Sequence, residues 1–244
     1  IINLLYNIVD RIYIGHISGV GAAALTGVGL FTPILMLINA FAMLAGSGGA
    51  PRAAISMGKK DNKTAEKILG NCFALLILMA VVLTVVFFTF APQLLTLFGA
   101  SEKTLPYGVA YARIYILGSI FVLIVMGMNP FITTQGFAKI SMMTTVIGAV
   151  INIILDPIFI FVFNLGVRGA ALATVLSQTV GAVWILRFLT GKKTILRLKR
   201  SNMHLDPKVF GPCLALGIST FVMLSTESLL SISFTSSLSR FGGD

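Results

Sequence analysis

Charged residues are scarce in this sequence, and acidic residues are the scarcest. Only 11% of the 244 residues are charged, and there are 8 Asp and Glu residues against 18 Lys and Arg. Hydrophobic residues make up 57%, and uncharged runs cover 68–101, 114–138 and 169–186. A helix needs about 20 apolar residues to cross a bilayer core, and these runs reach that length. The composition excludes an ordinary soluble domain and predicts an all-α, polytopic membrane protein.

Several motifs typical of metal binding, nucleotide binding and catalysis are also missing from the sequence. Cysteine is limited to Cys72 and Cys213, which lie in apolar stretches without CxxC or metal-ligand spacing, so we interpret both as small packing residues. There is no P-loop pattern, which argues against nucleotide-driven pumping by this chain. HExxH, GxSxG and paired DxxxD motifs do not occur either. The sequence therefore does not predict an enzyme, and we expect no cofactor.

Apolar runs between breaker residues predict seven helices, at 1–14, 22–47, 64–90, 105–134, 140–163, 169–190 and 207–238. The first is too short to span a bilayer, and we expect the sequence to be a piece of a longer protein. A polar linker at 191–206 separates an N-terminal six-helix lobe, residues 1–190, from the first helix of a second lobe, residues 207–244. Asp206 and Pro207 are typical of a helix start, with an acid at the N-cap and proline at the first helical position.

A net charge of +10 is compatible with a nucleic-acid partner. The placement of the charges along the sequence decides whether they indicate nucleic-acid binding or the cytoplasmic loops of a membrane protein. Lys and Arg gather in the segments after the predicted helices 22–47, 105–134 and 169–190. Short basic loops mark the cytoplasmic side of a membrane protein, so these loops are predicted to lie in the cytoplasm and no nucleic acid is expected. We expect a multi-pass protein of the bacterial inner (cell) membrane, surrounded by lipid and monomeric when complete. The basic residues are Arg52, Lys59, Lys60, Lys63, Lys67, Lys139, Arg187, Lys192, Lys193, Arg197, Lys199, Arg200 and Lys208.

Two acidic residues, Asp10 and Asp156, interrupt apolar stretches. A carboxylate at bilayer depth costs several kcal/mol unless it is protonated, paired or metal-bound, so such an acid predicts ion or proton handling. Asn152 precedes Asp156 by four residues, so both project from one helix face, and Pro157 leaves a backbone carbonyl free beside them. This set of oxygens suits Na⁺, and the same oxygens can instead hold a proton on the acid.

Further polar groups repeat this helical spacing. Thr174 and Gln178 are four residues apart, and Asn7 lies three residues before Asp10. Asn, Thr and Gln in membrane helices also serve simply to hydrogen-bond neighbouring helices, and that alternative stays open. Glu227 is a third acid in an apolar stretch, and we expect the adjacent serine and threonine hydroxyls to satisfy it.

Four segments together resemble the multidrug and toxic compound extrusion (MATE) family of cation-coupled exporters. They are 7–16 (NIVDRIYIGH), 46–61 (GSGGAPRAAISMGKKD), 152–157 (NIILDP) and 166–178 (GVRGAALATVLSQ). The resemblance covers the whole chain and implies a two-lobed transporter of about twelve helices, of which this chain is the N-terminal lobe and the start of the second. It also implies a cation or proton site in this lobe, which would be a metal site only for Na⁺ coupling. That site would use Asp10, Asn152, Asp156 and Thr174, with Asn7, Gln178 and Glu227 as candidate substrate-contacting or supporting residues.

The resulting hypothesis is an antiporter. An inward H⁺ or Na⁺ gradient would drive a small, amphipathic, cationic organic compound outward by alternating access. A lipid-linked oligosaccharide flippase of the same superfamily is the main alternative and would need a basic central cavity. A membrane-embedded transferase would need metal-binding acids at a membrane surface, and a scaffolding protein would move no solute.

Overall fold

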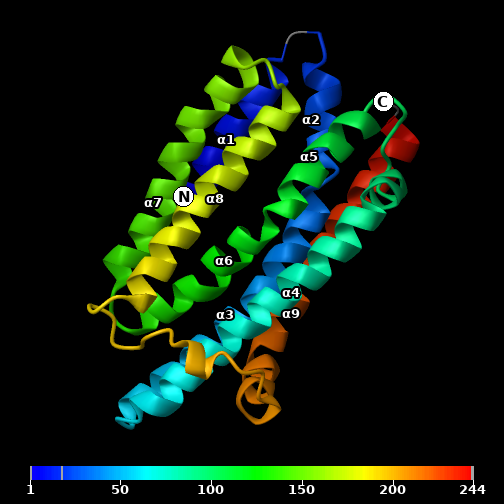
Figure 1. The fold of residues 1–244 in the computed structure, drawn as a ribbon. Coiled ribbons are helices and arrows are strands. Elements are labelled where there is room, and N and C mark those ends of the chain that lie inside the picture. Colours follow the sequence, from blue (N-terminus) through cyan, green and yellow to red (C-terminus); the bar gives the residue numbers. More distant parts are fainter. Residues whose placement is uncertain (1, 18, 243–244) are drawn as a thin grey trace.

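The computed structural model describes residues 2–17 and 19–242, with side chains described at 8–17 and 19–237. Within these residues the chain is a bundle of α-helices without strands (Figure 1). By length and apolar composition, five helical segments can cross a membrane, or six if the bent pair α5–α6 is one span. The predicted all-α, polytopic class is therefore confirmed. The elements are α1 (Ile2–Gly15), α2 (Gly21–Gly29), α3 (Thr32–Gly58), α4 (Asn62–Leu97), α5 (Leu105–Leu117), α6 (Ser119–Thr134), α7 (Ala138–Pro157), the π-helical turn η1 (Ile158–Val162), α8 (Val167–Thr190), the short 3₁₀ turn η2 (Arg200–Asn202) and α9 (Pro207–Gly242).

The predicted helix at 22–47 is a pair of helices, α2 and α3, and α3 continues to Gly58. The prediction that Arg52 lies in a loop was therefore wrong, because Arg52 belongs to α3. The glycines before it favour close helix packing, and the structure shows such packing. A Cβ on Gly46 would lie 2.7 Å from the carbonyl oxygen of Gly127 in α6, so glycine lets the two helices touch through their backbones.

The predicted helix at 105–134 is divided into α5 and α6, which meet at an angle of 56°. The break lies at Gly118, whereas Pro130 lies inside α6. Gly118 faces Val175 of α8, and a Cβ there would come 2.5 Å from a methyl group of that valine. Close packing against α8 therefore accompanies the bend.

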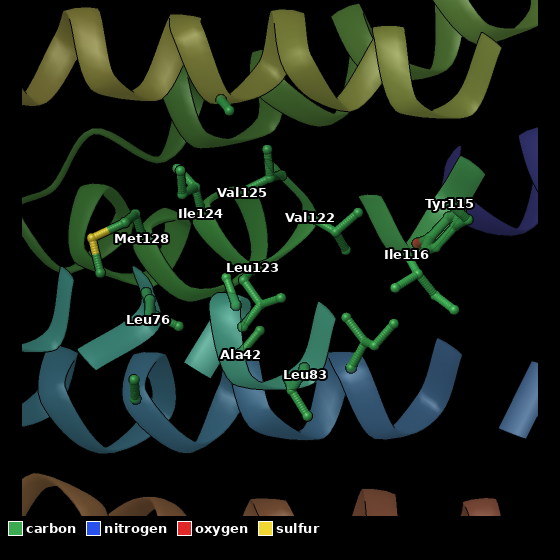
Figure 2. Close-up of a cluster of buried hydrophobic side chains, with 14 of the residues drawn as sticks. Ala42, Leu76, Leu83, Tyr115, Ile116, Val122, Leu123, Ile124, Val125 and Met128 are labelled. Atoms are coloured by element: carbon green, nitrogen blue, oxygen red, sulfur yellow. The ribbon is translucent and has the colours of Figure 1, made fainter. Parts of the chain in front are cut away.

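Apolar side chains from α3, α4, α5 and α6 form the core of the bundle, shown in Figure 2. Ala42 of α3, Leu76 of α4 and Leu123 of α6 are fully buried there. Many other large apolar residues face outward, among them Val85 and Phe90 of α4. An apolar exterior around an apolar core is the arrangement expected of helices in lipid.

Figure 1 shows α9 lying along α3, and these two helices share the most extensive packing in the chain. Residue pairs follow an antiparallel register along α3 from Pro33 to Gly48. The predicted capping at the start of α9 is confirmed, since the backbone N–H of Lys208 donates to Oδ1 of Asp206 at 3.0 Å. The α3–α9 contacts join Pro33 to Ser228, Phe41 to Phe221, Leu44 to Gly217 and Gly48 to Cys213.

The linker lies at the same end of the bundle as the α3–α4 turn and the α6–α7 connection (Figure 1). We call this end the linker end. It carries most of the basic residues, and three of the chain's acids, Asp61, Glu66 and Asp206, also lie there. The predicted grouping of these loops on one side of the bundle is thus present in the fold.

Candidate functional site

The predicted polar pair on α7 faces a hydroxyl on α8. The side-chain amide of Asn152 donates to Oδ1 of Asp156 at 3.2 Å and makes a longer contact of 3.4 Å with the hydroxyl oxygen of Thr174. That hydroxyl donates to the carbonyl oxygen of Ala170 at 3.0 Å, so its lone pairs stay turned toward Asn152. The helical spacing of Asn152 and Asp156 therefore produces the shared face that the sequence predicts.

Asp10 joins this pair from α1, which packs against α7 and α8. Asp10 is 8% exposed, Asn152 1%, Asp156 0% and Thr174 7%. Asp10 and Asp156 are close enough to interact electrostatically. We call these residues, Asp10, Asn152, Asp156 and Thr174, the oxygen cluster.

Oxygen atoms of the cluster lack hydrogen-bond partners among the described residues. They are Oδ1 of Asp10, Oδ1 of Asn152 and Oδ2 of Asp156. The nearest basic residue in sequence, Arg11, is exposed and its guanidinium donates to the hydroxyl of Thr32 at 3.5 Å, while its charge also acts on Asp10. A buried polar atom without a partner costs about 1–3 kcal/mol, so a proton or a cation bound at these oxygens would stabilise them.

The donor set favours a hard ion. The described residues contain no group of three or more His, Cys, Asp or Glu side chains that could hold a metal. Zinc and copper prefer such nitrogen and sulfur ligands, whereas Na⁺ and other hard cations accept carboxylate, amide and hydroxyl oxygens. The oxygen cluster fits Na⁺ or a proton by this criterion.

Local backbone features place the cluster. Pro157 ends α7 directly after Asp156, and the chain continues as the π-helical turn η1. Such turns occur often at functional sites because they re-aim neighbouring side chains. Gly169 at the start of α8 lies against η1, and a Cβ there would come 2.6 Å from the carbonyl carbon of Phe159. This close approach holds α8, and with it Thr174, beside α7.

A cavity of about 580 Å³ opens between α3, α6, α7 and α8, on the linker-end side of the cluster. Gln178 lines this cavity, and so does Ser177, whose hydroxyl donates to the carbonyl oxygen of Thr174 at 2.8 Å. Asn129 lines it too; its side-chain amide contacts the carbonyl oxygen of Ser141 at 3.4 Å, and its Oδ1 is buried without a partner. Asn129 is not among the site residues predicted from the sequence, although Asn before Pro within an apolar helix is a recognisable signal. The walls are apolar, hydroxyl and amide groups without a charged side chain: Met43, Ser47, Ala50, Pro51, Val125, Met126, Asn129, Pro130, Thr133, Thr134, Ser141, Thr144, Thr145, Gly148, Ala149, Ser177, Gln178 and Gly181.

The other candidate residues are not part of this arrangement. Asn7 lies in α1, but its side chain is outside the described residues. Glu227 is exposed on α9. The expectation that neighbouring hydroxyls satisfy Glu227 was wrong, because Thr226 donates to the carbonyl of Val222 and Ser228 donates to that of Pro33.

Taken together, the helices and the site define an all-α polytopic membrane protein with a buried oxygen cluster beside an uncharged cavity. The sequence profile of the MatE family matches residues 1–158, which is more than half of the chain. The protein belongs to the MatE family.

Named relatives agree with this assignment. The chain is 26% identical over 224 residues to the multidrug export protein MepA of Staphylococcus haemolyticus, covering 92% of this chain and 49% of that protein. It is 27% identical to the probable multidrug resistance protein YoeA of Bacillus subtilis, covering 97% and 52%. A solved structure described as the inward-facing conformation of a multidrug resistance MATE family transporter superposes with a TM-score of 0.87 at 28% identity, covering 93% of this chain and 51% of that one. The chain spans about half the length of these relatives.

Proposed function

We propose that this chain is the N-terminal half of a cation-coupled antiporter that exports amphipathic organic compounds. The observation that carries the proposal is the oxygen cluster, with its buried carboxylates and unpartnered oxygens. An intramembrane acid without a basic partner is expensive and marks an ion or proton pathway. In this proposal Asp10 and Asp156 hold the coupling ion, and Asn152 and Thr174 supply further oxygens.

The cavity is the proposed path of the exported compound. Its volume of about 580 Å³ lies within the range of small-molecule sites, and its methionine and valine surfaces suit varied apolar compounds. Hydroxyl and amide side chains in its wall favour a compound that also carries hydrogen-bond donors or positive charge. No Lys or Arg lines the cavity, which argues against a flippase for an anionic lipid-linked sugar.

The oxygen cluster and the cavity are neighbours along α8, which would allow ion binding and drug binding to influence each other. Thr174 of the cluster and Gln178 of the cavity wall lie on successive turns of α8, and Ser177 bonds to the backbone of Thr174. Any coupling between ion and drug must be reciprocal, so each ligand weakens the other by the same factor in the facing state where they compete. One charge moving through about 100 mV supplies about 2.3 kcal/mol, which is ample for a concentration gradient of export.

The identity of the ion is the direct test. The complete protein is reconstituted into proteoliposomes, and transport of ethidium, a planar organic cation, is followed first with a Na⁺ gradient at equal pH and then with a pH gradient at equal Na⁺. The proposal predicts transport in at least one arrangement and none without a gradient. Ethidium movement that is independent of both gradients would contradict it.

The linker end is proposed to face the cytoplasm, because its loops hold the excess of Lys and Arg. Labelling of a cysteine introduced at Lys192 by a membrane-impermeant maleimide checks this. We expect reaction only after the cells are opened. Labelling of intact cells would reverse the orientation.

A further inference from the structure

The linker is polar in sequence, yet it is held down on the N-terminal lobe. Leu196 is 0% exposed and Leu198 7%. The backbone N–H of Leu198 donates to the carbonyl oxygen of Leu189 at the end of α8. Further along the linker, Asn202 packs against Gly70 of α4. A Cβ on Gly70 would lie 2.7 Å from the carbonyl carbon of Asn202. These contacts hold the polar linker against the helices of the N-terminal lobe.

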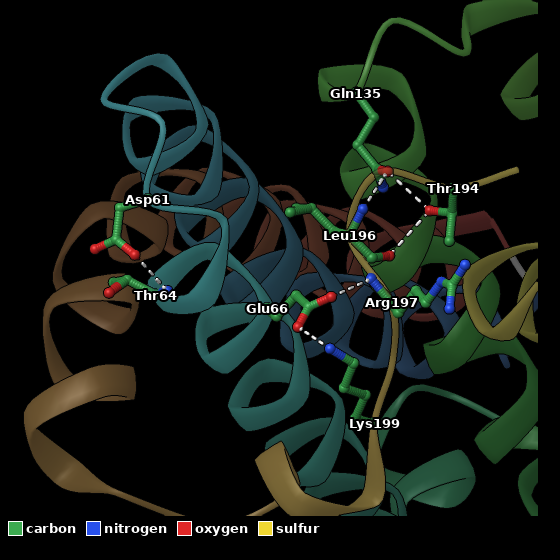
Figure 3. Close-up of polar contacts among 8 residues, drawn as sticks. All are labelled: Asp61, Thr64, Glu66, Gln135, Thr194, Leu196, Arg197 and Lys199. Carbon is green, nitrogen blue, oxygen red and sulfur yellow. Dashed lines mark hydrogen bonds and ion pairs between the residues drawn. The ribbon is translucent and has the colours of Figure 1, made fainter. Parts of the chain in front are cut away.

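A single side chain at the end of α6 provides the densest anchor. Oε1 of Gln135 accepts hydrogen bonds from the hydroxyl of Thr194 at 2.8 Å and from the backbone N–H of Leu196 at 2.9 Å (Figure 3). It also accepts one from the backbone N–H of Ile195 at 2.9 Å. The amide nitrogen of Gln135 donates to the carbonyl oxygen of Phe131 at 2.9 Å. The side chain is 7% exposed, so both ends of its amide are used away from water.

Two side chains of α4 extend the attachment toward α9. Glu66 accepts a hydrogen bond from the backbone N–H of Arg197 at 3.2 Å and forms an ion pair with Lys199 at 2.6 Å (Figure 3). Asn71 donates to the carbonyl of Asn202 and accepts from the backbone N–H of Asp206 at 2.8 Å. Asp206 is the N-cap of α9, so the linker is tied down along its course to that helix.

Gln135 also adjoins the cavity. Thr133 and Thr134, which line the cavity, directly precede it, and α6 carries Asn129 a turn and a half earlier. A displacement of the linker-end half of α6 therefore moves Gln135 with it. Because Gln135 is hydrogen-bonded to residues 194–196, a displacement of α6 would also move the linker, and with it the start of α9.

We propose that Gln135 is a positioning residue that joins the α6 wall of the cavity to the linker, so that occupancy of the cavity is transmitted to the first helix of the second lobe. The inference rests on the proposed function in taking the cavity as the drug site. It adds that Gln135 connects the cavity to α9, and that the linker transmits movement between them.

Trypsin measures the attachment directly, because Arg197, Lys199 and Arg200 are cleavage sites within the linker. Cleavage of a transiently opened segment follows the population of the open form. Loss of three hydrogen bonds in Gln135→Ala is expected to speed linker cleavage roughly 10- to 100-fold in the complete protein. Cleavage at Lys59 and Lys60 in the α3–α4 turn is the internal control and should not change. Gln135→Glu keeps an acceptor for the same donors but loses the donor to the carbonyl oxygen of Phe131 and buries a charge, so its cleavage rate should lie between those of the wild type and Gln135→Ala.

Transmission is tested by ethidium. In the wild-type protein, saturating ethidium is expected to change the rate of linker cleavage roughly 5-fold or more, the lower range of allosteric coupling. In Gln135→Ala this response should vanish while ethidium still binds with wild-type affinity, as followed by its fluorescence. The same variant should lower the maximal rate of ethidium export without changing the concentration for half-maximal export.

The inference is overturned if Gln135→Ala leaves linker cleavage at the wild-type rate, or if the ethidium response survives in that variant. Failure of the proposed function looks different. The wild-type protein would then export no ethidium under any gradient, whereas ethidium would still change linker cleavage and Gln135→Ala would still abolish that change.

Discussion

Replacement of Gly217 by alanine should separate α9 from α3. A Cβ at this position would meet the backbone of Leu44, at 2.9 Å from its carbonyl carbon and 3.1 Å from its Cα, with the carbonyl oxygen nearer still. Ordinary carbon–carbon contacts lie at about 3.5–4.0 Å, so the helices must move apart by about 1 Å at this level. The atoms in the way belong to the backbone of Leu44, which cannot rotate aside as the end of a flexible side chain can.

The magnitude follows from two opposed effects. Alanine favours a helix over glycine by about 1 kcal/mol, and overpacking a close contact costs about 1–3 kcal/mol. Separation also removes dispersion contacts along the most extensively packed helix pair of the described residues, so we place Gly217→Ala at the upper part of that cost. The net expectation is destabilisation by about 1–2 kcal/mol.

Gly211 provides the matched control. It lies in the same helix, and a Cβ there would have no atom within 4 Å. Gly211→Ala should therefore show only the gain in helix propensity and stabilise by up to about 1 kcal/mol. The assay is the temperature at which the detergent-solubilised protein loses its monodisperse peak in size-exclusion chromatography. Shifts of the same sign for both variants would refute the packing argument.

Two further predictions concern single side chains. Thr174→Val keeps the volume but removes an acceptor for the Asn152 amide, so the ion concentration for half-maximal transport should rise roughly 3- to 10-fold, and an unchanged value would exclude Thr174 from the site. Hydrogen bonds from Thr64 hold the pKa of Asp61 below its ordinary value of 3.8, because they favour the charged carboxylate. The stabilisation by this cap is therefore fully present above the ordinary pKa and is lost as the pH falls through the lowered one. Hydrogen exchange at the Thr64 amide should speed up beyond its intrinsic pH dependence only in that acidic range, and Asp61→Asn should remove the effect.

The fold class and the site pair on α7 could be predicted from the sequence because both depend on local spacing. Runs of apolar residues set the spans, and four-residue spacing alone puts Asn152 and Asp156 on one helix face. The start of α9 was predictable for the same reason, since Asp206 caps its own helix.

Features that depend on long-range packing could not be predicted in this way. The glycines around Gly46 favour close packing, but only the structure shows that Gly46 packs on Gly127 of α6. The linker has the composition of a solvated loop, and its order depends on Gln135, Glu66 and Asn71 from helices distant in sequence. Nothing in the spacing of these residues indicates that they meet.

Asp156→Asn tests the central claim most directly. The amide keeps the size of the side chain and an acceptor for Asn152, but it cannot release a proton or carry the charge that holds Na⁺. Ethidium export by the complete protein should then lose its dependence on the driving gradient and fall to the rate of empty liposomes. Glu102→Gln is the control, an exposed acid in the connection between α4 and α5 that lies outside the oxygen cluster and the cavity, and should retain export. Gradient-driven export by Asp156→Asn at the wild-type rate would contradict the assignment of the oxygen cluster as the coupling site.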